Sequence, residues 1–160
     1  MEIIRAATAA DKDEILKLYK TMLFGPADWD DDYPSMETIE YDLERDALFV
    51  MVDEDGSIIA AISIDLDEDV EILPCWDKNL EPGAELSRLA VREDKRNRGI
   101  ARRMMQHVFD VLRDEGKKSV HILVREQNVA AFVSYEKLGY RRVGYCHLHE
   151  KEYVCMEVAL

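Results

Sequence analysis

The feature that most constrains this chain's fold is a junction in its second half, where an apolar run passes through a basic turn into a helical run. Residues 86–91 form the apolar run, and the turn reads Arg96-Asn97-Arg98-Gly99-Ile100-Ala101. The first backbone N–H groups of a helix lack partners and lie at its positive end, which suits an anion. Gly99 leaves room for close approach, and arginines match phosphate oxygens. The junction predicts a strand, a phosphate-binding turn and a helix in succession.

Alternating strand-like and helical segments fill the rest of the chain. The apolar patterns predict strands at 2–6, 47–52, 57–66, 84–91, 119–124, 140–148 and 152–160. Helices are expected at 11–23, for a short stretch after Ser35, and at 100–115 and 128–138. The loop Phe24–Ser35 and the acidic connection Asp67–Gly83 are expected to be irregular. With 160 residues and no repeat or linker, the sequence predicts a single α/β domain, residues 1–160, with helices on both faces of a central sheet.

Charge is distributed unevenly along the chain. The whole chain carries 34 Asp and Glu against 21 Lys and Arg, and residues 1–84 carry 23 against 6. Because nucleic-acid binding needs a basic face, no nucleic-acid partner is expected. The basic second half suits an anion, whereas the acidic first half either attracts a cation or only keeps the protein soluble. No apolar run reaches the ~20 residues of a membrane span, and a secretion signal is not evident. We therefore expect a cytoplasmic protein without a membrane partner.

Cysteine and histidine give little sign of a disulfide or metal site. Cys75, Cys146 and Cys155 are odd in number and lack C-x-x-C spacing, so we expect reduced thiols in the interior. His147 and His149 fall on one face of an expected strand, but the sequence suggests no third ligand for them. We therefore expect no metal.

Two motifs in the second half resemble the GNAT N-acetyltransferase superfamily. Arg96-x-x-Gly99-x-Ala101 matches the acyl-coenzyme A signature of that family, and residues 128–140 match its pattern N-x-x-A-x-x-x-Y-x-x-x-G-(F/Y). The resemblance covers residues 85–140 by specific motifs and the rest of the chain by the order of its elements. It implies a GNAT-like single domain with a mixed, mostly antiparallel twisted sheet, and acetyl-CoA as co-substrate.

The resemblance also implies which residues bind the donor. In the family, backbone amides of the signature turn hold the coenzyme A pyrophosphate, and the preceding strand pairs with the pantetheine arm through its backbone. The asparagine that caps the next helix also contacts the coenzyme. The acetyl-CoA-binding residues expected here are Leu89, Ala90, Val91, Arg96, Asn97, Arg98, Gly99, Ile100, Ala101 and Asn128.

Two residues are candidates for proton transfer. Tyr135 falls at the family's general-acid position, and a phenol with a pKa near ~10 keeps its proton at neutral pH. Its other interpretation is a core aromatic residue. Glu85 opens the motif strand, where several family members carry a catalytic glutamate, and its other interpretation is an exposed strand-start carboxylate. Relatives that use a different glutamate have it where this chain has Leu123, which favours Glu85.

The resemblance implies an enzyme that transfers an acetyl group to a primary amine of a small molecule or peptide. The amine would attack the thioester directly in a ternary complex. The acidic residues Asp28, Asp30, Asp31 and Asp32 would suit a cationic acceptor, or are merely a solvated loop. A non-catalytic acyl-CoA-binding or regulatory domain on the same fold is the alternative. The last two strands could pair across a homodimer.

Overall fold

The computed structural model describes residues 1–23 and 25–160, so Phe24 of the expected loop lies outside the described residues. In the described chain, seven strands form one sheet in the order β1-β2-β3-β4-β5-β7-β6. The strands are β1 Ile3–Ala6, β2 Leu48–Val52, β3 Ile58–Asp65, β4 Gly83–Val91, β5 Ser119–Val124, β6 Arg141–Leu148 and β7 Lys151–Ala159. Neighbouring strands run antiparallel except β4 and β5, which run parallel. The predicted mixed, mostly antiparallel sheet is confirmed.

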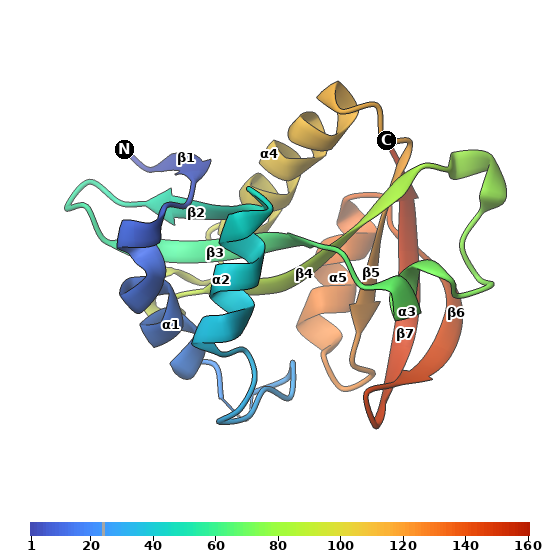
Figure 1. The fold of residues 1–160 in the computed structure, drawn as a ribbon, viewed down its shortest axis with the longest axis horizontal. Coiled ribbons are helices and arrows are strands. Elements are labelled where there is room, and N and C mark those ends of the chain that lie inside the picture. Colours follow the sequence, from blue (N-terminus) through green and yellow to red (C-terminus); the bar gives the residue numbers. More distant parts are fainter. Residues whose placement is uncertain (24) are drawn as a thin grey trace.

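Helices cover both faces of this sheet, as predicted (Figure 1). They are α1 Lys12–Lys20, α2 Met36–Glu44, α3 Glu68–Glu71, α4 Ile100–Asp114 and α5 Val129–Lys137, with short 3-10 turns at Ala9–Asp11, Lys78–Leu80 and Glu93–Lys95. None of the described helices combines the length and the apolar character that crossing a membrane would require.

Each face of the sheet buries its own hydrophobic core. Ile15 of α1 and Ile39 of α2 are fully buried against one face. Met104 and Leu112 of α4 are fully buried against the other. All five residues of β2 are buried, because their side chains alternate between the two cores. A strand covered on both faces is a continuous apolar run, which made β2 easy to predict.

The strands β4 and β5 separate soon after they meet. Their parallel pairing covers three residue pairs in the described chain, which are Gly83 with Ser119, Ala84 with Val120 and Glu85 with His121. Beyond this point β4 continues along β3, and β5 continues along β7. The backbone groups that residues 86–91 turn toward β5 therefore have no strand partner on that side. The sheet opens at Glu85, and the gap between the two strands is available to a ligand.

A bulge in β4 changes the direction of one side chain beside this gap. Arg88 and Leu89 together stand opposite Ile62 of β3, whereas regular pairing resumes on either side. Arg88 has a φ of 51°, a left-handed conformation that costs a non-glycine residue about 1 kcal/mol or more. Bulges of this kind re-aim side chains near functional sites. Here the bulge directs Arg88 into the space between α2 and the sheet, where it meets the buried carboxylate of Asp42.

The connection between β3 and β4 is more ordered than the sequence indicated. Asp67 begins α3 by accepting a hydrogen bond from the backbone N–H of Asp69 at 3.0 Å. The indole N–H of Trp76 donates to the carbonyl of Val70 at 2.7 Å, and the indole ring stacks on His121 with centroids 4.5 Å apart. The prediction of an irregular connection was wrong for α3, since four residues are too few to show a helical period.

The three cysteines are free thiols that lie near one another. Cys155 is fully buried, whereas Cys75 and Cys146 are half-buried. Cys75 packs on Gly144, because a Cβ placed on that glycine would lie 2.9 Å from the Cys75 Cβ. Burial raises the pKa of all three thiols. Cys155 is thus an interior thiol, as predicted, and the other two lie at the edge of the interior.

Candidate active site

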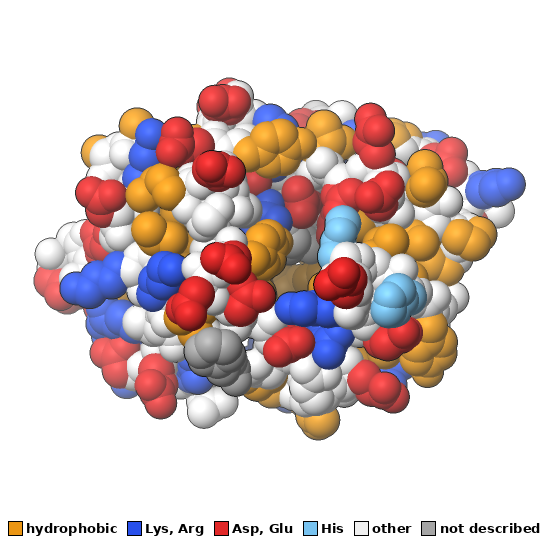
Figure 2. Space-filling view, turned by 60° about the horizontal axis from the view of Figure 1, so that its bottom comes forward, with side chains coloured by type: hydrophobic (Ala, Val, Ile, Leu, Met, Phe, Trp, Pro, Cys, Tyr) orange, Lys and Arg blue, Asp and Glu red, His pale blue; other side chains and the backbone are white. Residues whose placement is uncertain are grey.

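Two cavities border the gap between β4 and β5. The larger, which we call the acidic cavity, has a volume of about 820 Å³ and is lined by the loop 27–33, by α3 and its flanks, and by β4 and β5. The smaller, which we call the basic cavity, has a volume of about 610 Å³ and lies between the turn 95–102 and α5. Leu89, Asn128 and Tyr135 line both cavities. Figure 2 shows a hollow in this face of the molecule with acidic, basic and histidine side chains around it. Ligands in the two cavities would meet where the strands diverge.

The basic cavity contains most of the residues that the motifs assigned to acetyl-CoA. The predicted residues that line it are Leu89, Val91, Arg96, Asn97, Gly99, Ile100, Ala101 and Asn128. Ala90 and Arg98 do not line it in the described structure. The side chain of Ala90 is fully buried in the core beneath α1 and α2, on the opposite face of the strand.

The turn before α4 leaves the first helical amides open toward this cavity. Gly99 has a φ of 74° and directly precedes α4, and no side chain of the described residues caps this helix end. A Cβ placed on Gly99 would have a single neighbour within 4 Å, the Arg102 guanidinium at 3.8 Å. Unpaired amides at the positive end of a helix, with arginines beside them, form an anion site. The predicted phosphate-binding turn therefore has suitable geometry.

Seven further residues line the basic cavity, and the motifs did not indicate them. They are Met22, Lys95, Arg102, Ala130, Val133, Ser134 and Lys137. The four on α5 have i, i+3, i+4 and i+7 spacing, so the helical period of the sequence contained this signal. Met22 had no such signal, because it follows α1 and approaches the cavity through the fold. Its sulfur lies 3.2 Å from Nη2 of Arg96.

Tyr135 lies at the junction of the two cavities. Its side chain is 7% exposed, and its ring centroid lies 5.7 Å from that of Tyr140. Burial raises the pKa of Tyr135 to about 12, so the phenol keeps its proton at neutral pH. A protonated phenol at this position can donate a hydrogen bond or a proton to an anion formed in the junction.

Glu85 lines the acidic cavity at the point where β4 and β5 diverge. Its side chain is 4% exposed, and its Oε1 has no hydrogen-bond partner among the described residues. Burial, together with the carboxylates of Asp65 and Asp67, raises the pKa of Glu85 to about 9. The interpretation of Glu85 as an exposed carboxylate is therefore wrong. Its ionised form would be a base nearly as strong as an aliphatic amine.

A buried ion-pair network forms the wall of the acidic cavity beside Glu85. Arg88 donates to Asp42 at 2.8 Å, to Asp65 at 3.0 Å and to the hydroxyl of Tyr33 at 2.9 Å. Asp42 is fully buried. Burial raises the pKa of Asp65, but the Arg88 guanidinium outweighs this and holds the pKa below its ordinary value. The network ties the loop that contains Tyr33 to the sheet. The sequence could not indicate it, because it joins residues from four separate segments.

The acidic loop after α1 contributes less charge to the cavity than its sequence suggested. Oδ2 of Asp28 lies 3.4 Å from Nη2 of Arg125 and 3.6 Å from Nζ of Lys151, which compensate it. The members of the loop that line the cavity are Ala27, Trp29, Asp30 and Tyr33. The loop therefore supplies aromatic walls and one lining carboxylate.

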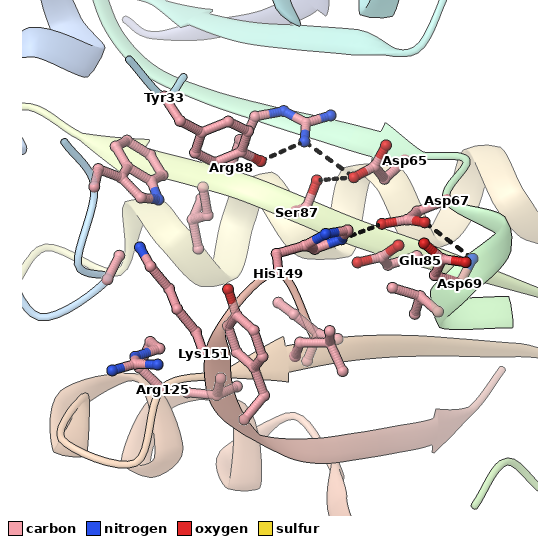
Figure 3. A pocket seen from close by; sticks show the side chains of 18 of the residues that line it. Tyr33, Asp65, Asp67, Asp69, Glu85, Ser87, Arg88, Arg125, His149 and Lys151 are labelled. Carbon is pink, nitrogen blue, oxygen red and sulfur yellow. Dashed lines mark hydrogen bonds and ion pairs between the residues drawn. The ribbon is translucent and has the colours of Figure 1, made fainter. Parts of the chain in front are cut away.

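A different acidic group faces the cavity from the start of α3. Asp67, Asp69 and His149 hold one side-chain oxygen or nitrogen each within 4.8 Å of the other two. Figure 3 shows these side chains close to Glu85, and Nε2 of His149 lies 3.0 Å from Oδ2 of Asp67. His147 instead lies 2.6 Å from Glu152. The two histidines considered as joint metal ligands thus have separate partners.

Comparisons with known proteins identify the family and the fold. Residues 12–140 match the acetyltransferase (GNAT) family. A 57-residue segment is 37% identical to the [ribosomal protein bS18]-alanine N-acetyltransferase of Salmonella typhimurium, and this match spans 36% of the chain and 38% of that relative's length.

Solved structures of other acetyltransferases share the fold over the whole chain. The ribosomal-protein-S18-alanine N-acetyltransferase of Escherichia coli has a TM-score of 0.76 at 19% identity, over 99% of this chain and 94% of that one. A GNAT superfamily phosphinothricin acetyltransferase of Sinorhizobium meliloti, in complex with acetyl-CoA, has a TM-score of 0.77 at 17% identity, over 99% and 88% of the two chains. With the family match over residues 12–140, the chain belongs to the GNAT acetyltransferase family.

Proposed function

We propose that this protein is an acetyl-CoA-dependent N-acetyltransferase that acts on a primary amine of a small molecule or peptide. The observation that carries the proposal is the meeting of two cavities of different chemistry at Leu89, Asn128 and Tyr135. Direct transfer between two substrates requires that both are bound at once with their reacting atoms in contact. Membership of the GNAT acetyltransferase family supports acetyl-CoA as the donor.

In this proposal acetyl-CoA occupies the basic cavity. Its pyrophosphate accepts hydrogen bonds from the backbone amides of residues 98–101, with the positive charge of Arg96 beside it. The pantetheine arm pairs with the unpartnered backbone of residues 89–91, as an added strand would. Asn128 caps α5 by accepting from the N–H of Ala131 at 3.4 Å, and it stands at the thioester end of the cavity.

The acceptor amine approaches from the acidic cavity. Its nitrogen forms a bond to the acetyl carbon and loses a proton, which ionised Glu85 accepts directly or through a water. The tetrahedral intermediate then expels the coenzyme A thiolate, and the hydroxyl of Tyr135 donates a proton to that sulfur. The products are an N-acetylated amine and free coenzyme A. This scheme uses no metal ion.

The acceptor class includes peptide amines. The name of the Salmonella typhimurium relative states that its acceptor is an alanine of a ribosomal protein, and the matched segment supports a related acceptor here. We also propose that the protein works in the cytoplasm. Pairing of two copies through β6, which forms one edge of the sheet, stays a prediction.

Amine-dependent release of free thiol tests the proposed function. The protein is incubated with acetyl-CoA and a panel of primary amines and of peptides with free N-termini, and coenzyme A and the acetylated product are measured. We expect thiol release that depends on the amine and equals the amount of N-acetylated product. Tight acetyl-CoA binding without transfer to any member of the panel would instead favour a non-catalytic acyl-CoA-binding domain.

A further inference from the structure

The charges around the acidic cavity are not evenly compensated. Arg88 neutralises Asp65, and Arg125 and Lys151 lie against Asp28. Figure 3 shows Arg125 and Lys151 on the opposite side of the cavity from the carboxylates at the start of α3. The cavity therefore has one side where positive charges are already paired and one side where negative charge is in excess.

Besides Asp30 in the loop after α1, the negative charge without a Lys or Arg partner among the described residues gathers at the start of α3, at Asp67, Glu68 and Asp69. Two carboxylates face one imidazole, that of His149, and their ligand atoms all lie within 4.8 Å of one another. The side chain of Asp67 is 28% exposed and that of His149 is 59% exposed, so a ligand can reach both from the cavity. Like charges at this spacing repel, and a cation between them would relieve the repulsion.

Glu85 provides a second and independent sign of a missing ligand. It is 4% exposed, and its Oε1 has no hydrogen-bond partner among the described residues. Figure 3 shows its carboxyl group beside Asp67 and Asp69 and directed into the same space. A buried polar atom without a partner destabilises the folded protein, and a donor group of a bound ligand would remove this cost. Three carboxyl groups therefore converge on a space where nitrogen donors of a ligand would fit.

We propose that the acceptor carries a second cationic group, and that Asp67 and Asp69 bind this group while the reacting amine reaches Glu85 and Tyr135. This inference rests on the proposed function, since it names the class of acceptor for the same site. The acceptor is then a diamine or a longer polycation rather than a monoamine. Asp67 and Asp69 determine specificity and take no part in the chemical step.

A matched set of acceptors tests the inference in kinetics. The probes are 1,6-diaminohexane, 6-amino-1-hexanol and 6-aminohexanoate, which share a chain length and a primary amine but end in a cation, a neutral group or an anion. Hydrogen bonds to charged groups contribute about 1.5–3 kcal/mol each, so we expect kcat/KM per amine to be about 10- to 100-fold higher for the diamine than for the alcohol. The carboxylate compound is expected to be poorer still.

Two double variants test whether Asp67 and Asp69 are the source of the preference for the diamine. Asp67→Asn with Asp69→Asn removes both charges, and Asn can still cap α3. Asp31→Asn with Asp32→Asn removes two charges from the loop after α1, at exposed positions that do not line the cavity in the described structure. We expect the first variant to lose the preference for the diamine and the second to keep it.

Thermal unfolding of the coenzyme A complex gives a readout that needs no catalysis. A ligand that binds the folded state raises the melting temperature, so 1,6-diaminohexane is expected to stabilise the wild type and the loop variant, and to lose most of this effect in Asp67→Asn with Asp69→Asn. Equal shifts from the diamine and the amino alcohol would overturn the inference. It would also be overturned if Zn²⁺ stabilised the protein through Asp67 and Asp69 while the diamine did not. If the diamine binds as expected but no amine is acetylated, the cation site stands and the proposed function fails.

Discussion

The basic and the acidic cavity are built in different ways. The basic cavity is lined by two short stretches of chain, residues 89–102 and 128–137, together with Met22. The acidic cavity takes its lining from the loop 27–33, from α2, from the end of β3 and α3, and from β4 and β5. The segment after β5, α5, the β6–β7 turn and the start of β7 complete it. A site made of the backbone of one turn depends on few residue identities, whereas a site made of side chains from many segments changes with each of them. Under the proposed function, the donor half of this site therefore depends mainly on one turn and one helix, whereas the acceptor half depends on side chains from many segments.

Tyr135, which the two cavities share, gives the largest expected effect. Tyr135→Phe removes the hydroxyl proton and keeps the ring, so kcat is expected to fall by a factor of about 10²–10⁴. The KM values for acetyl-CoA and for the amine are expected to stay close to those of the wild type. Steady-state kinetics with both substrates varied measures all three.

Tyr140→Phe is the matched control for this variant. Tyr140 is 3% exposed, its hydroxyl has no hydrogen-bond partner among the described residues, and it does not line either cavity in the described structure. Loss of the Tyr140 hydroxyl should leave kcat unchanged. A wild-type kcat for Tyr135→Phe would remove this residue from the mechanism.

A substitution of Arg88 tests whether the acidic cavity can be disrupted while the basic cavity stays intact. Arg88→Met removes one ion-pair partner of the fully buried Asp42, which keeps Arg45 at 2.7 Å and the hydroxyl of Ser63 at 2.7 Å. Breaking a buried pair costs about 3–5 kcal/mol, and the partners that Asp42 keeps place the expected cost toward the lower end of this range. We expect urea titration to show a loss of unfolding free energy in this range. In the protein that stays folded, we expect a higher KM for the amine. Arg92→Met, which removes an exposed pair with Asp94, should change stability far less. An equal effect of both variants would contradict the network as a support of the acceptor cavity.

The raised pKa of Glu85 makes the free energy of unfolding fall as the pH rises. Its pKa of about 9 in the folded state lies above the ordinary value of 4.5, so the folded state holds a proton that the unfolded state loses as the pH rises from about 4.5 to 9. This contribution to stability is fully present below pH 4.5 and is lost by about pH 9. The groups around Glu85 that titrate or carry charge are unchanged in Glu85→Gln, and they include Asp65, Asp67, Asp69, Glu71, Arg88, His121, Tyr33 and Cys146.

Glu85→Gln is therefore expected to be more stable than the wild type at pH 8, by up to about 5 kcal/mol, and equal to it near pH 4. Thermal unfolding at a series of pH values measures the difference. Glu126→Gln, at an exposed position, should show no such pH-dependent difference. The acetylation rate of the wild type should rise with pH toward 9, and a rate that stays flat from pH 6 to 9 would remove Glu85 as the base.

Gly99 gives the smallest expected effect and tests the donor half alone. At a φ of 74°, Gly99→Ala costs about 1–2 kcal/mol in the turn and places a methyl group where the phosphate would approach. We expect the KM for acetyl-CoA to rise about tenfold and the KM for the amine to stay unchanged. Gly56→Ala introduces the same left-handed strain, at a φ of 85°, but Gly56 does not line either cavity in the described structure. Apart from its chain neighbours, no described residue has a heavy atom within 4 Å of the added carbon. If both variants raise the KM for acetyl-CoA, the effect comes from stability and not from the turn.

The sequence predicted the elements around the basic cavity well because each of their signals is local. Gly99 lies between a strand and a helix, and Ala131 and Tyr135 lie one turn apart on the same face of α5, where all three residues line the basic cavity. Their roles toward acetyl-CoA stay a prediction. The alternation of apolar segments likewise predicted every strand of the described sheet to within a few residues.

The acceptor half was poorly predicted because its contacts join distant segments. In the sequence, nothing distinguished the carboxylate of Asp28 from that of Asp67. The fold brings Arg125 and Lys151 to Asp28, whereas the ion-pair partner of Asp67 among the described residues is His149. The contacts of Arg88 depend on the bulge in β4. Regular alternation along a strand predicts the direction of each side chain, and a bulge changes that direction. Burial of Glu85 also follows from the packing of the connection between β3 and β4, which no local pattern indicates.

The early separation of β4 and β5 has a consequence for solubility. Two unpaired strand edges face each other inside the molecule, and unpaired edges are normally sites where other chains add on and aggregate. Here α4 and α5 both cover one face of the sheet (Figure 1), and the gap borders the two cavities. Under the proposed function, the pantetheine arm fills the gap in every cycle. The cosubstrate would then serve as a temporary eighth strand, and aggregation of the protein on storage should slow when acetyl-CoA or coenzyme A is present.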